Sequence, residues 1–407
     1  MGKPKISAAT HVFQPMHIAV TTRFLLPGGH LEGLGRYTFE ALRCLVQQQP
    51  QCTFHFLFDR AYDPRYLLAP NVVPHVLPPP ARHPLLMLAW YEGAVALWLR
   101  RHRPAALLSP EGFTVLGTRV PRVVVLHDLA YLHRPQDIGW AIARYYAHFL
   151  PRFARAATQL VAVSDATRQD IALQYGLDPS GILVAHNAPA RHFAPQPAAA
   201  QVATRARFSQ GQPYFLFVGA LQPRKNLLNL LRAFALFKAG GGAAATPVRL
   251  LLVGRTAWKA GPVFEVFRSL PAEVQAAIAF TGRVSETDLA DLYAAALATA
   301  YVPFFEGFGL PVVEAQASGC PVLTSNISSL PEAAGGPAAA VLCDPHQPAA
   351  IAAGLQQLAH DAPLRARLRT AGLANAASFS WEHTAQVLWQ AVQAAVAAGS
   401  DVGPTLG

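Results

Sequence analysis

The chain has 407 residues, of which 52% are hydrophobic and only 14% are charged. It is therefore long enough for two packed domains and too apolar for a disordered protein. Its formal net charge of +10 suits a negatively charged partner. Because no zinc-finger spacing, aromatic RNA-binding motif or basic helix accompanies that charge, the sequence argues against nucleic acid as the partner.

Short apolar runs alternate with amphipathic segments over residues 16–190. The first 15 residues lack the apolar core of a signal peptide. Strands are expected at 17–23, 53–59, 105–110, 122–128, 159–165 and 182–187, and helices at 35–49, 85–101, 139–156 and 165–176. This alternation predicts a parallel sheet with helices on both faces.

The expected helix at 85–101 is strongly apolar, but Glu92 interrupts it and arginines follow it. No run in the chain reaches the roughly 18 uncharged apolar residues of a membrane-spanning helix. Two interpretations stay open for this helix. It either covers the core of its domain or docks on the surface of an anionic membrane.

A Pro- and Ala-rich segment at 191–212 predicts a linker with a short helix. A second alternating set follows, with strands expected at 214–219, 248–254, 278–282, 298–303, 321–325 and 339–344, a surface loop at 240–245 and a final helix at 381–399. The second domain should therefore span 213–380. Two doubly wound domains that face each other across a cleft are expected.

Gly33, Gly35 and Arg36 come soon after the first strand. Glycines there let backbone N–H groups approach a phosphate, and the arginine adds positive charge. A dinucleotide-binding fingerprint needs a third glycine, but Thr38 occupies that position, which disfavours a hydride-transfer enzyme. The alternative is a plain tight loop with a surface arginine.

His127 and Asp128 end the apolar run 123–126, at the edge where parallel sheets bind their ligands. A single histidine at such a position is more often structural than functional. Arg224 and Lys225 follow the strand at 214–219. Two fixed positive charges suit a departing diphosphate, whose negative charge grows as its bond breaks. The alternative for this pair is a solvated charged turn.

Two carboxylates eight positions apart, Glu306 and Glu314, enclose a glycine-rich stretch with Pro311. The pattern predicts strand, loop, short helix and strand, with Glu306 in the loop and Glu314 in the first helical turn. The free N–H groups at this helix start can hold a phosphate, so one carboxylate could face a sugar and the other a ribose. A glycosidase-like pair is disfavoured, because it needs both carboxyls at one bond.

Eight short motifs occur in a fixed order along the chain: GLGRY at 33–37, HD at 127–128, VSDAT at 163–167, HN at 186–187, VGALQPRKN at 218–226, GR at 282–283, EGFGLPVVE at 306–314 and SSLPEAAG at 328–335. Together they resemble the retaining, nucleotide-sugar-dependent glycosyltransferases of family 4. The resemblance covers most of residues 16–385. It implies the α/β fold called GT-B, with two Rossmann-like domains and a final helix that crosses back to the first domain.

The resemblance also implies roles for individual residues. The donor would be bound by Gly33, Gly35, Arg36, Gly219, Arg283, Gly307, Phe308, Gly309, Leu310 and Glu314, with Glu314 on the ribose. The catalytic residues implied are His127 on the transferred sugar, Arg224 and Lys225 on the leaving group, and Glu306 near the sugar hydroxyls, while Asp128 orients the sugar or meets the acceptor. One departure is Ala220, because many relatives carry a basic residue just after the glycine that here is Gly219.

The activity implied is transfer of a hexose, with mannose from GDP-mannose as the first expectation, to a glycan or a lipid-linked acceptor in polysaccharide assembly. No D-x-D motif lies in a suitable loop, so the enzyme is expected to need no metal and no cofactor. Four cysteines without metal or C-x-x-C spacing predict reduced thiols in a cytoplasmic protein, peripheral on the membrane if the helix at 85–101 docks there. The alternatives are a catalytically silent scaffold and another GT-B chemistry such as an epimerase.

Overall fold

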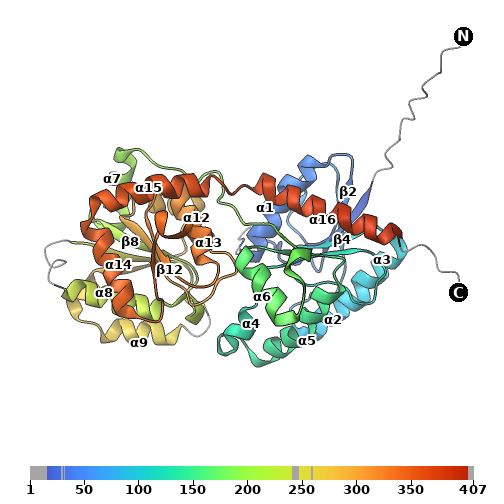
Figure 1. Ribbon diagram of the computed structural model, residues 1–407, viewed down its shortest axis with the longest axis horizontal. Coiled ribbons are helices and arrows are strands. Elements are labelled where there is room, and N and C mark those ends of the chain that lie inside the picture. Colours follow the sequence, from blue (N-terminus) through green and yellow to red (C-terminus); the bar gives the residue numbers. More distant parts are fainter. Residues whose placement is uncertain (1–15, 29–30, 32, 241–246, 258–259, 402–407) are drawn as a thin grey trace, which may run out of the picture.

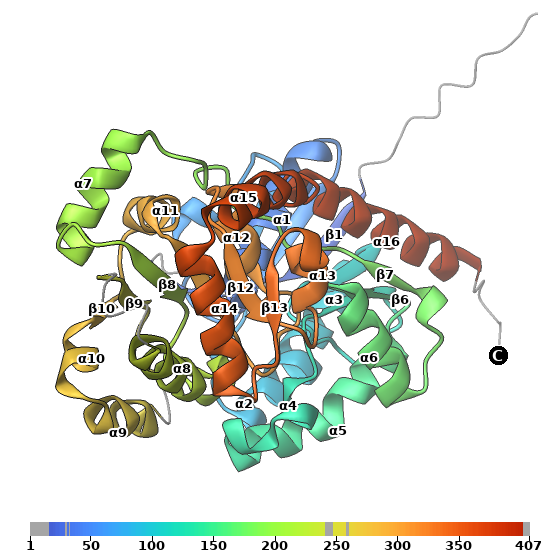
Figure 2. The same cartoon turned by 60° about the vertical axis from the view of Figure 1, so that its left-hand side comes forward.

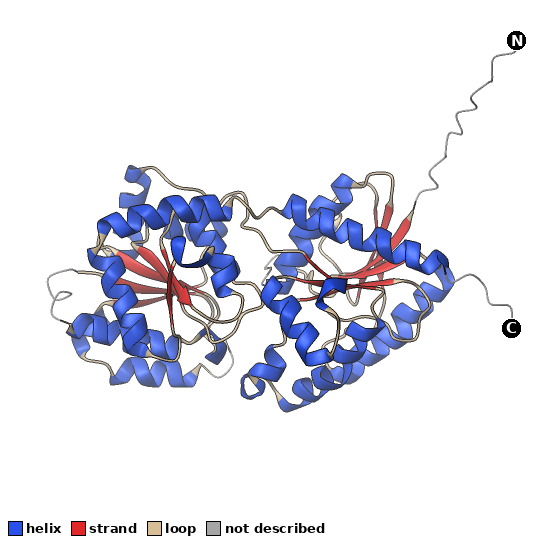
Figure 3. Cartoon of the chain, viewed as in Figure 1, coloured by secondary structure: helices blue, strands red, loops and turns tan. Residues whose placement is uncertain are grey.

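Two parallel β-sheets, each covered by helices on both faces, form two lobes that lie side by side (Figures 1 and 3). The computed structural model describes residues 16–28, 31, 33–240, 247–257 and 260–401. This is the doubly wound α/β architecture predicted from the alternation of apolar runs. Within the described ranges, no helix combines the length and the apolar character that crossing a membrane requires.

The first sheet has seven strands in the order β3-β2-β1-β4-β5-β6-β7. Its strands are β1 (His17–Thr21), β2 (Thr53–Phe58), β3 (Val72–Val76), β4 (Ala106–Ser109), β5 (Arg122–Leu126), β6 (Gln159–Ala162) and β7 (Ile182–Val184). Its helices are α1 (Gly33–Gln48), α2 (Pro84–Leu88), α3 (Ala96–His102), α4 (Ala130–His133), α5 (Trp140–Ala156) and α6 (Asp165–Tyr175), with a π-helical turn η2 (Ala89–Val95) between α2 and α3. Strand order reverses between β1 and β4, which creates a crevice at the carboxyl ends of the strands.

The second sheet has six strands in the order β10-β9-β8-β11-β12-β13, all parallel (Figure 2). They are β8 (Tyr214–Val218), β9 (Arg249–Val253), β10 (Ile278–Gly282), β11 (Ala298–Tyr301), β12 (Val322–Ser325) and β13 (Val341–Cys343). The helices are α7 (Ala198–Ser209) in the linker segment, then α8 (Leu227–Ala239), α9 (Gly261–Ser269), α10 (Ala272–Ala276), α11 (Glu286–Ala295), α12 (Leu310–Ala317), α13 (Leu330–Ala334), α14 (Pro348–His360) and α15 (Ala362–Ala376). Short 3₁₀ turns complete the chain: η1 (Pro64–Tyr66), η3 (Pro135–Asp137), η4 (Pro179–Gly181), η5 (Pro223–Lys225) and η6 (Gly336–Ala338).

Helix α16 (Trp381–Asp401) leaves the second lobe and lies along the first (Figure 1). It packs against α1 and against strands β4 to β7. Trp381, Leu388 and Val392 of this helix belong to the same buried apolar cluster as Ile18 and Phe54 of the first sheet. The first lobe is therefore built from two segments that are far apart in the sequence.

All the predicted strands are present, and the differences from prediction are local. Strand β3 is not indicated by the pattern because Pro74 interrupts it; as an edge strand it tolerates a proline. The single helix expected at 85–101 is instead α2, η2 and α3. Helix α16 extends to Asp401, beyond the expected end of the final helix at position 399. The surface loop expected at 240–245 lies, apart from Gly240, outside the described residues.

Candidate active site

The polar residues predicted from the two domains lie at the carboxyl ends of strands that meet at the interdomain junction. His127 and Asp128 directly follow β5, whereas Lys225 ends the 3₁₀ turn after β8 and Glu306 lies in the loop after β11. Ion pairs link the two domains, and the one inside this site joins Nη1 of Arg224 to Oδ2 of Asp128 at 3.8 Å. The fold thus brings residues from both sheets into one charged site.

The centre of this site is a partly buried cluster of charges around Glu306. Its Oε1 atom accepts a 2.6 Å hydrogen bond from Nζ of Lys225 and lies 3.4 Å from Nη1 of Arg224. Lys225 also donates to the hydroxyl of Tyr301 at 2.6 Å. Burial alone would raise the pKa of Glu306, but the charges of Arg224 and Lys225 hold it below its usual value. Glu306 is therefore ionised, and both Lys225 and Arg224 form ion pairs with it.

His127 is fixed in one tautomer by its surroundings. Its Nε2 atom lies 2.7 Å from the carbonyl oxygen of Pro110, so Nε2 carries the hydrogen and donates. The edge of the ring meets Tyr37, with the ring centroids 4.7 Å apart. Burial lowers the pKa of His127. A neutral imidazole in this tautomer offers Nδ1 as an acceptor, which suits a sugar hydroxyl.

The glycine-rich loop of the second domain lies directly on the backbone of the first. A Cβ atom on Gly307 would lie 1.7 Å from the carbonyl oxygen of His127, so only glycine fits there. Gly309 has a φ of 108°, which also favours glycine, and it precedes Leu310, the first residue of α12. The side chain of Phe308 is only 3% exposed and packs against His186 and Phe379, so its backbone alone is left for a donor.

Glu314 differs from prediction in one respect. It is the fifth residue of α12, at the start of the second helical turn rather than in the first. The carboxyl is buried, and Oε2 accepts a 3.2 Å hydrogen bond from the hydroxyl of Tyr293. Burial raises the pKa of Glu314 to about 7, against the opposing charge of Arg36. Glu314 therefore changes its charge near neutral pH.

Gly33, Gly35 and Arg36 form the first turn of α1. A Cβ atom on Gly35 would lie 2.8 Å from the carbonyl oxygen of Phe24, which explains the need for glycine at this position. The guanidinium of Arg36 forms an ion pair with Glu286, the first residue of α11 in the second domain. Arg36, which is predicted to contact the donor diphosphate, is thus paired with a carboxylate of the other domain in this structure.

The remaining predicted donor residues lie at strand ends of the second sheet. Gly219 follows β8, with a φ of 152°, and Gly254 approaches it so closely that a Cβ there would lie 2.0 Å from the Gly219 oxygen. Ala220 comes next and brings no charge. Arg283 follows β10 and is exposed. Nothing in this arrangement discriminates among nucleotide bases.

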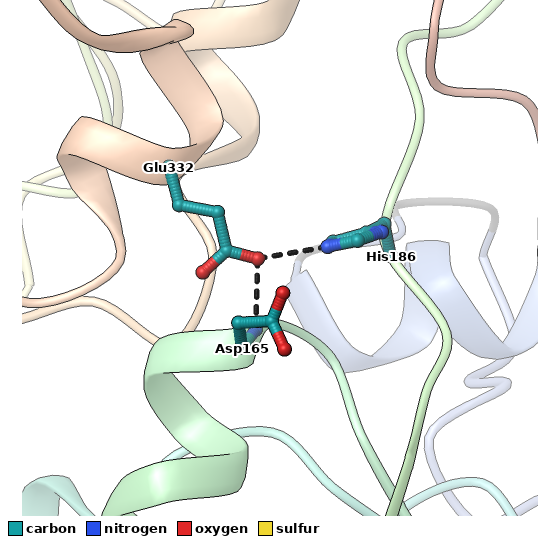
Figure 4. Close-up of side chains that lie close together, drawn as sticks. All are labelled: Asp165, His186 and Glu332. Carbon is teal, nitrogen blue, oxygen red and sulfur yellow. Dashed lines mark hydrogen bonds and ion pairs between the residues drawn. The ribbon is translucent and has the colours of Figure 1, made fainter.

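One group of side chains among the described residues has the spacing of a metal site: Asp165, His186 and Glu332 (Figure 4). Both oxygens of Glu332 already accept hydrogen bonds, from the backbone N–H groups of Asp165 and Ala166 and from Nε2 of His186. Oδ1 of Asp165 pairs with Arg168 at 2.6 Å. Hydrogen bonds therefore account for this group without an ion.

Several residues of the junction carry no role in the sequence prediction. Tyr301 accepts a hydrogen bond from Lys225, Tyr293 donates one to Glu314, and Glu286 pairs with Arg36. Ser164 and Glu332 lie inside the quoted motifs VSDAT and SSLPEAAG, yet those motifs do not reveal which residues they meet. Glu286 and the two tyrosines lie outside every motif, so no signal in the sequence indicates them.

Comparisons with known families cover both domains. Residues 31–188 match the family described as Glycosyltransferase Family 4, and residues 203–374 match Glycosyl transferases group 1. The O-antigen chain mannosyltransferase B of Escherichia coli is 31% identical over 309 residues, which cover 74% of this chain and 78% of that protein. A D-inositol 3-phosphate glycosyltransferase of Streptomyces scabiei is 29% identical over 401 residues, covering 91% and 88%.

Solved structures with the same architecture span almost the whole chain. Anabaena Alr3699/HepE, in complex with UDP and glucose, superimposes with a TM-score of 0.72 at 17% identity, covering 93% of this chain and 99% of that one. The sucrose-phosphate synthase of Thermosynechococcus elongatus gives a TM-score of 0.72 at 18% identity, covering 94% and 100%. At these identities the likeness concerns the fold.

Proposed function

Because the chain belongs to the family 4 glycosyltransferases, we propose that it moves a hexose from a nucleoside diphosphate sugar to a hydroxyl group of a glycan or a lipid-linked glycan. Membership of the family supports the general activity, which is transfer of a sugar from a nucleotide sugar. The observation that supports the reaction at this junction is the partly buried cluster of Lys225, Arg224 and Glu306 beside His127.

The chemistry assigned to the site is substitution at the anomeric carbon. The bond from that carbon to the diphosphate oxygen breaks, and negative charge grows on the diphosphate. Arg224 and Lys225 are fixed cations that stabilise this charge, and burial strengthens the effect. Glu306 and Nδ1 of His127 accept hydrogen bonds from sugar hydroxyls and orient the ring.

We assign retention of configuration to the reaction. The acceptor oxygen attacks from the face that the diphosphate leaves, and its proton passes to a phosphate oxygen of the departing group. No protein base is then needed, and the cations supply the electrostatic stabilisation that a metal supplies elsewhere. The proposal therefore includes activity that does not depend on a divalent metal.

Mannose from GDP-mannose is our first candidate donor, because the O-antigen chain mannosyltransferase B of Escherichia coli is 31% identical to this chain. The neighbour structure that holds UDP and glucose makes UDP-glucose the competing donor to test. Polysaccharide assembly in the cytoplasm is the setting we propose. The four cysteines support it, since all four are buried and unpaired.

A peripheral association with an anionic membrane is part of this proposal. Helices α2 and α5 contact each other, and they expose Leu85 (71%) and Trp140 (74%). The guanidinium of Arg144 lies 5.3 Å from the Trp140 ring centroid, and Arg82 is also exposed nearby in the chain. Exposed apolar side chains with arginines nearby suit the headgroup region of an anionic bilayer.

Vesicle flotation tests that association. The double variant Leu85→Ser, Trp140→Ser should lose binding to phosphatidylglycerol vesicles, whereas Leu173→Ser should keep it, because Leu173 is 79% exposed but lies on α6. Phosphatidylcholine vesicles should bind neither variant nor the parent protein. Equal flotation of the double variant and the parent would refute the docking surface.

The transferase proposal is tested by thermal unfolding with GDP, UDP, ADP and their common sugars, with and without EDTA. A ligand that binds only the folded state raises the melting temperature. We expect a shift with GDP and GDP-mannose that EDTA does not remove, followed by mannose transfer with retained anomeric configuration. A well-folded protein that shifts with none of these ligands would favour the silent scaffold.

A further inference from the structure

Glu332, on α13 of the second domain, contacts the first domain at three points. Figure 4 shows two of them, to Asp165 and to His186. Its Oε1 atom accepts the backbone N–H of Asp165 at 2.8 Å, and Oε2 accepts that of Ala166 at 3.0 Å. Nε2 of His186, just after β7, donates to Oε1 at 2.8 Å. One carboxylate thus binds two separate segments of the opposite domain.

The two backbone donors are the first N–H groups of α6. Such groups have no partner within their own helix and carry partial positive charge, so a carboxylate stabilises them. Ser164 caps the same helix from within its own domain by accepting from the N–H of Thr167. Burial alone would raise the pKa of Glu332, but these hydrogen bonds hold it below its usual value, so Glu332 carries a charge at neutral pH.

The residues just before α13 hold the glycine-rich loop. Oγ of Ser329 donates to the carbonyl oxygens of Glu306 and Phe308 at 2.9 and 2.8 Å. The carbonyl oxygen of Gly307 points the other way and accepts from Ser164 at 2.6 Å and Thr167 at 2.9 Å. The start of α6 therefore contacts both α13 and the loop that α13 supports.

We propose that Glu332 is a positioning residue, which holds the two domains together so that the loop from Glu306 to Leu310 stays against His127. This inference rests on the proposed function for its catalytic consequence. The geometry behind it is a pair of linked contacts. His186 and the start of α6 donate to Glu332 of α13, and Ser329, the residue just before α13, donates to the carbonyl of Glu306. Opening the junction must break the links to Asp165, Ala166 and His186.

The consequence is a separation of binding from turnover. Gly219, Arg283 and Glu314, which are assigned to the nucleotide, belong to the second domain. Arg36 of the first domain has its own ion pair with Glu286, so nucleotide affinity should depend little on the Glu332 contact. The reaction needs His127 of the first domain at the sugar. His127 takes that position only while the two domains are held against each other. Loss of the contact between Glu332 and the first domain should therefore lower kcat, while the Kd for the nucleotide changes little.

The experiment compares Glu332→Ala with the parent protein, and with Glu273→Gln as a control on an exposed side chain of α10. In Glu332→Ala, kcat with GDP-mannose or UDP-glucose should fall about 10- to 100-fold. The Kd for GDP or UDP should stay within about threefold, which is under 1 kcal/mol. The radius of gyration from solution scattering should increase, whereas the control should match the parent in all three measurements.

If Glu332→Ala does not fold, Glu332→Gln replaces it, because the amide keeps the shape and loses the charge. A variant with the kcat and radius of gyration of the parent would overturn the inference. A variant in which kcat and nucleotide affinity fall together would overturn it too, because that pattern indicates a damaged second domain. If the parent transfers no sugar, the proposed function fails, and the scattering comparison still decides whether Glu332 holds the domains together.

Discussion

Gly307 of the second domain lies against His127 of the first so closely that their backbones are in direct contact. A Cβ atom at position 307 would lie 1.7 Å from the His127 carbonyl oxygen and 3.0 Å from Cβ of Asp128. The glycine therefore does more than permit a turn. It lets the backbone of the glycine-rich loop approach the end of the strand that precedes His127.

Replacing Gly307 by alanine should push the domains apart, because the two nearest atoms that it would meet belong to the His127 backbone and cannot move aside. We expect turnover to fall about 10- to 100-fold, since small displacements of reacting groups cost that much. The matched control is Gly139→Ala, at a φ of −72° with no atom within 4 Å of the added Cβ. Steady-state kinetics of both variants check this, and equal rates would contradict the close approach.

Lys225→Met should lower kcat/KM about 10²- to 10³-fold, the range seen when one group that stabilises transition-state charge is removed. The variant also leaves Glu306 with Arg224 as its remaining cation within 4 Å, so the free energy of unfolding should fall as well. Lys238→Met, on α8, serves as the control for loss of one lysine charge. A Lys225→Met enzyme that turns over like the parent would remove this lysine from the site.

Arg36 and Glu286 can be separated by paired substitutions. If Arg36 binds the donor diphosphate, Arg36→Ala should raise the donor KM about tenfold, a loss near 1.4 kcal/mol. Glu286→Gln should leave the donor KM unchanged or lower it, because it releases Arg36 from its ion pair. Measuring KM for both variants decides the matter. Equal increases would mean that the pair itself, rather than Arg36 on the donor, is what the enzyme needs.

The elevated pKa of Glu314 has a consequence for stability. The carboxyl has a pKa of about 7 in the folded state against an ordinary 4.5, so it favours folding below pH 4.5 and loses that contribution as the pH rises through 7. Glu314→Gln cannot ionise, so its Tm should exceed that of the parent by more at about pH 8 than at about pH 5. Thermal unfolding checks this, with Glu273→Gln as the control. A difference that does not depend on pH would contradict the elevated pKa.

The sequence predicts the sheets and strand ends well because their signals are local. Apolar runs and the residues that follow them place His127, Lys225 and Glu306 at strand ends, and the structure has them there. The partners across the junction are not local. His186 and Glu332 lie 146 positions apart, and Arg36 and Glu286 lie 250 apart, so no periodicity or spacing links them. The direction of a side chain is also not predictable from the sequence. Phe308 is expected at the donor, but its ring packs between the domains.

Helix α16 has a consequence for how the protein is made. Its buried side chains complete the apolar core under the first sheet, yet the ribosome adds them only after the whole second domain. Domains usually fold as they are synthesised, in order from the N-terminus. Here the nascent first domain keeps an uncovered apolar face until α16 has been made. The domain whose synthesis starts first is therefore the last to complete its core. Chaperones should bind to that uncovered face in the meantime.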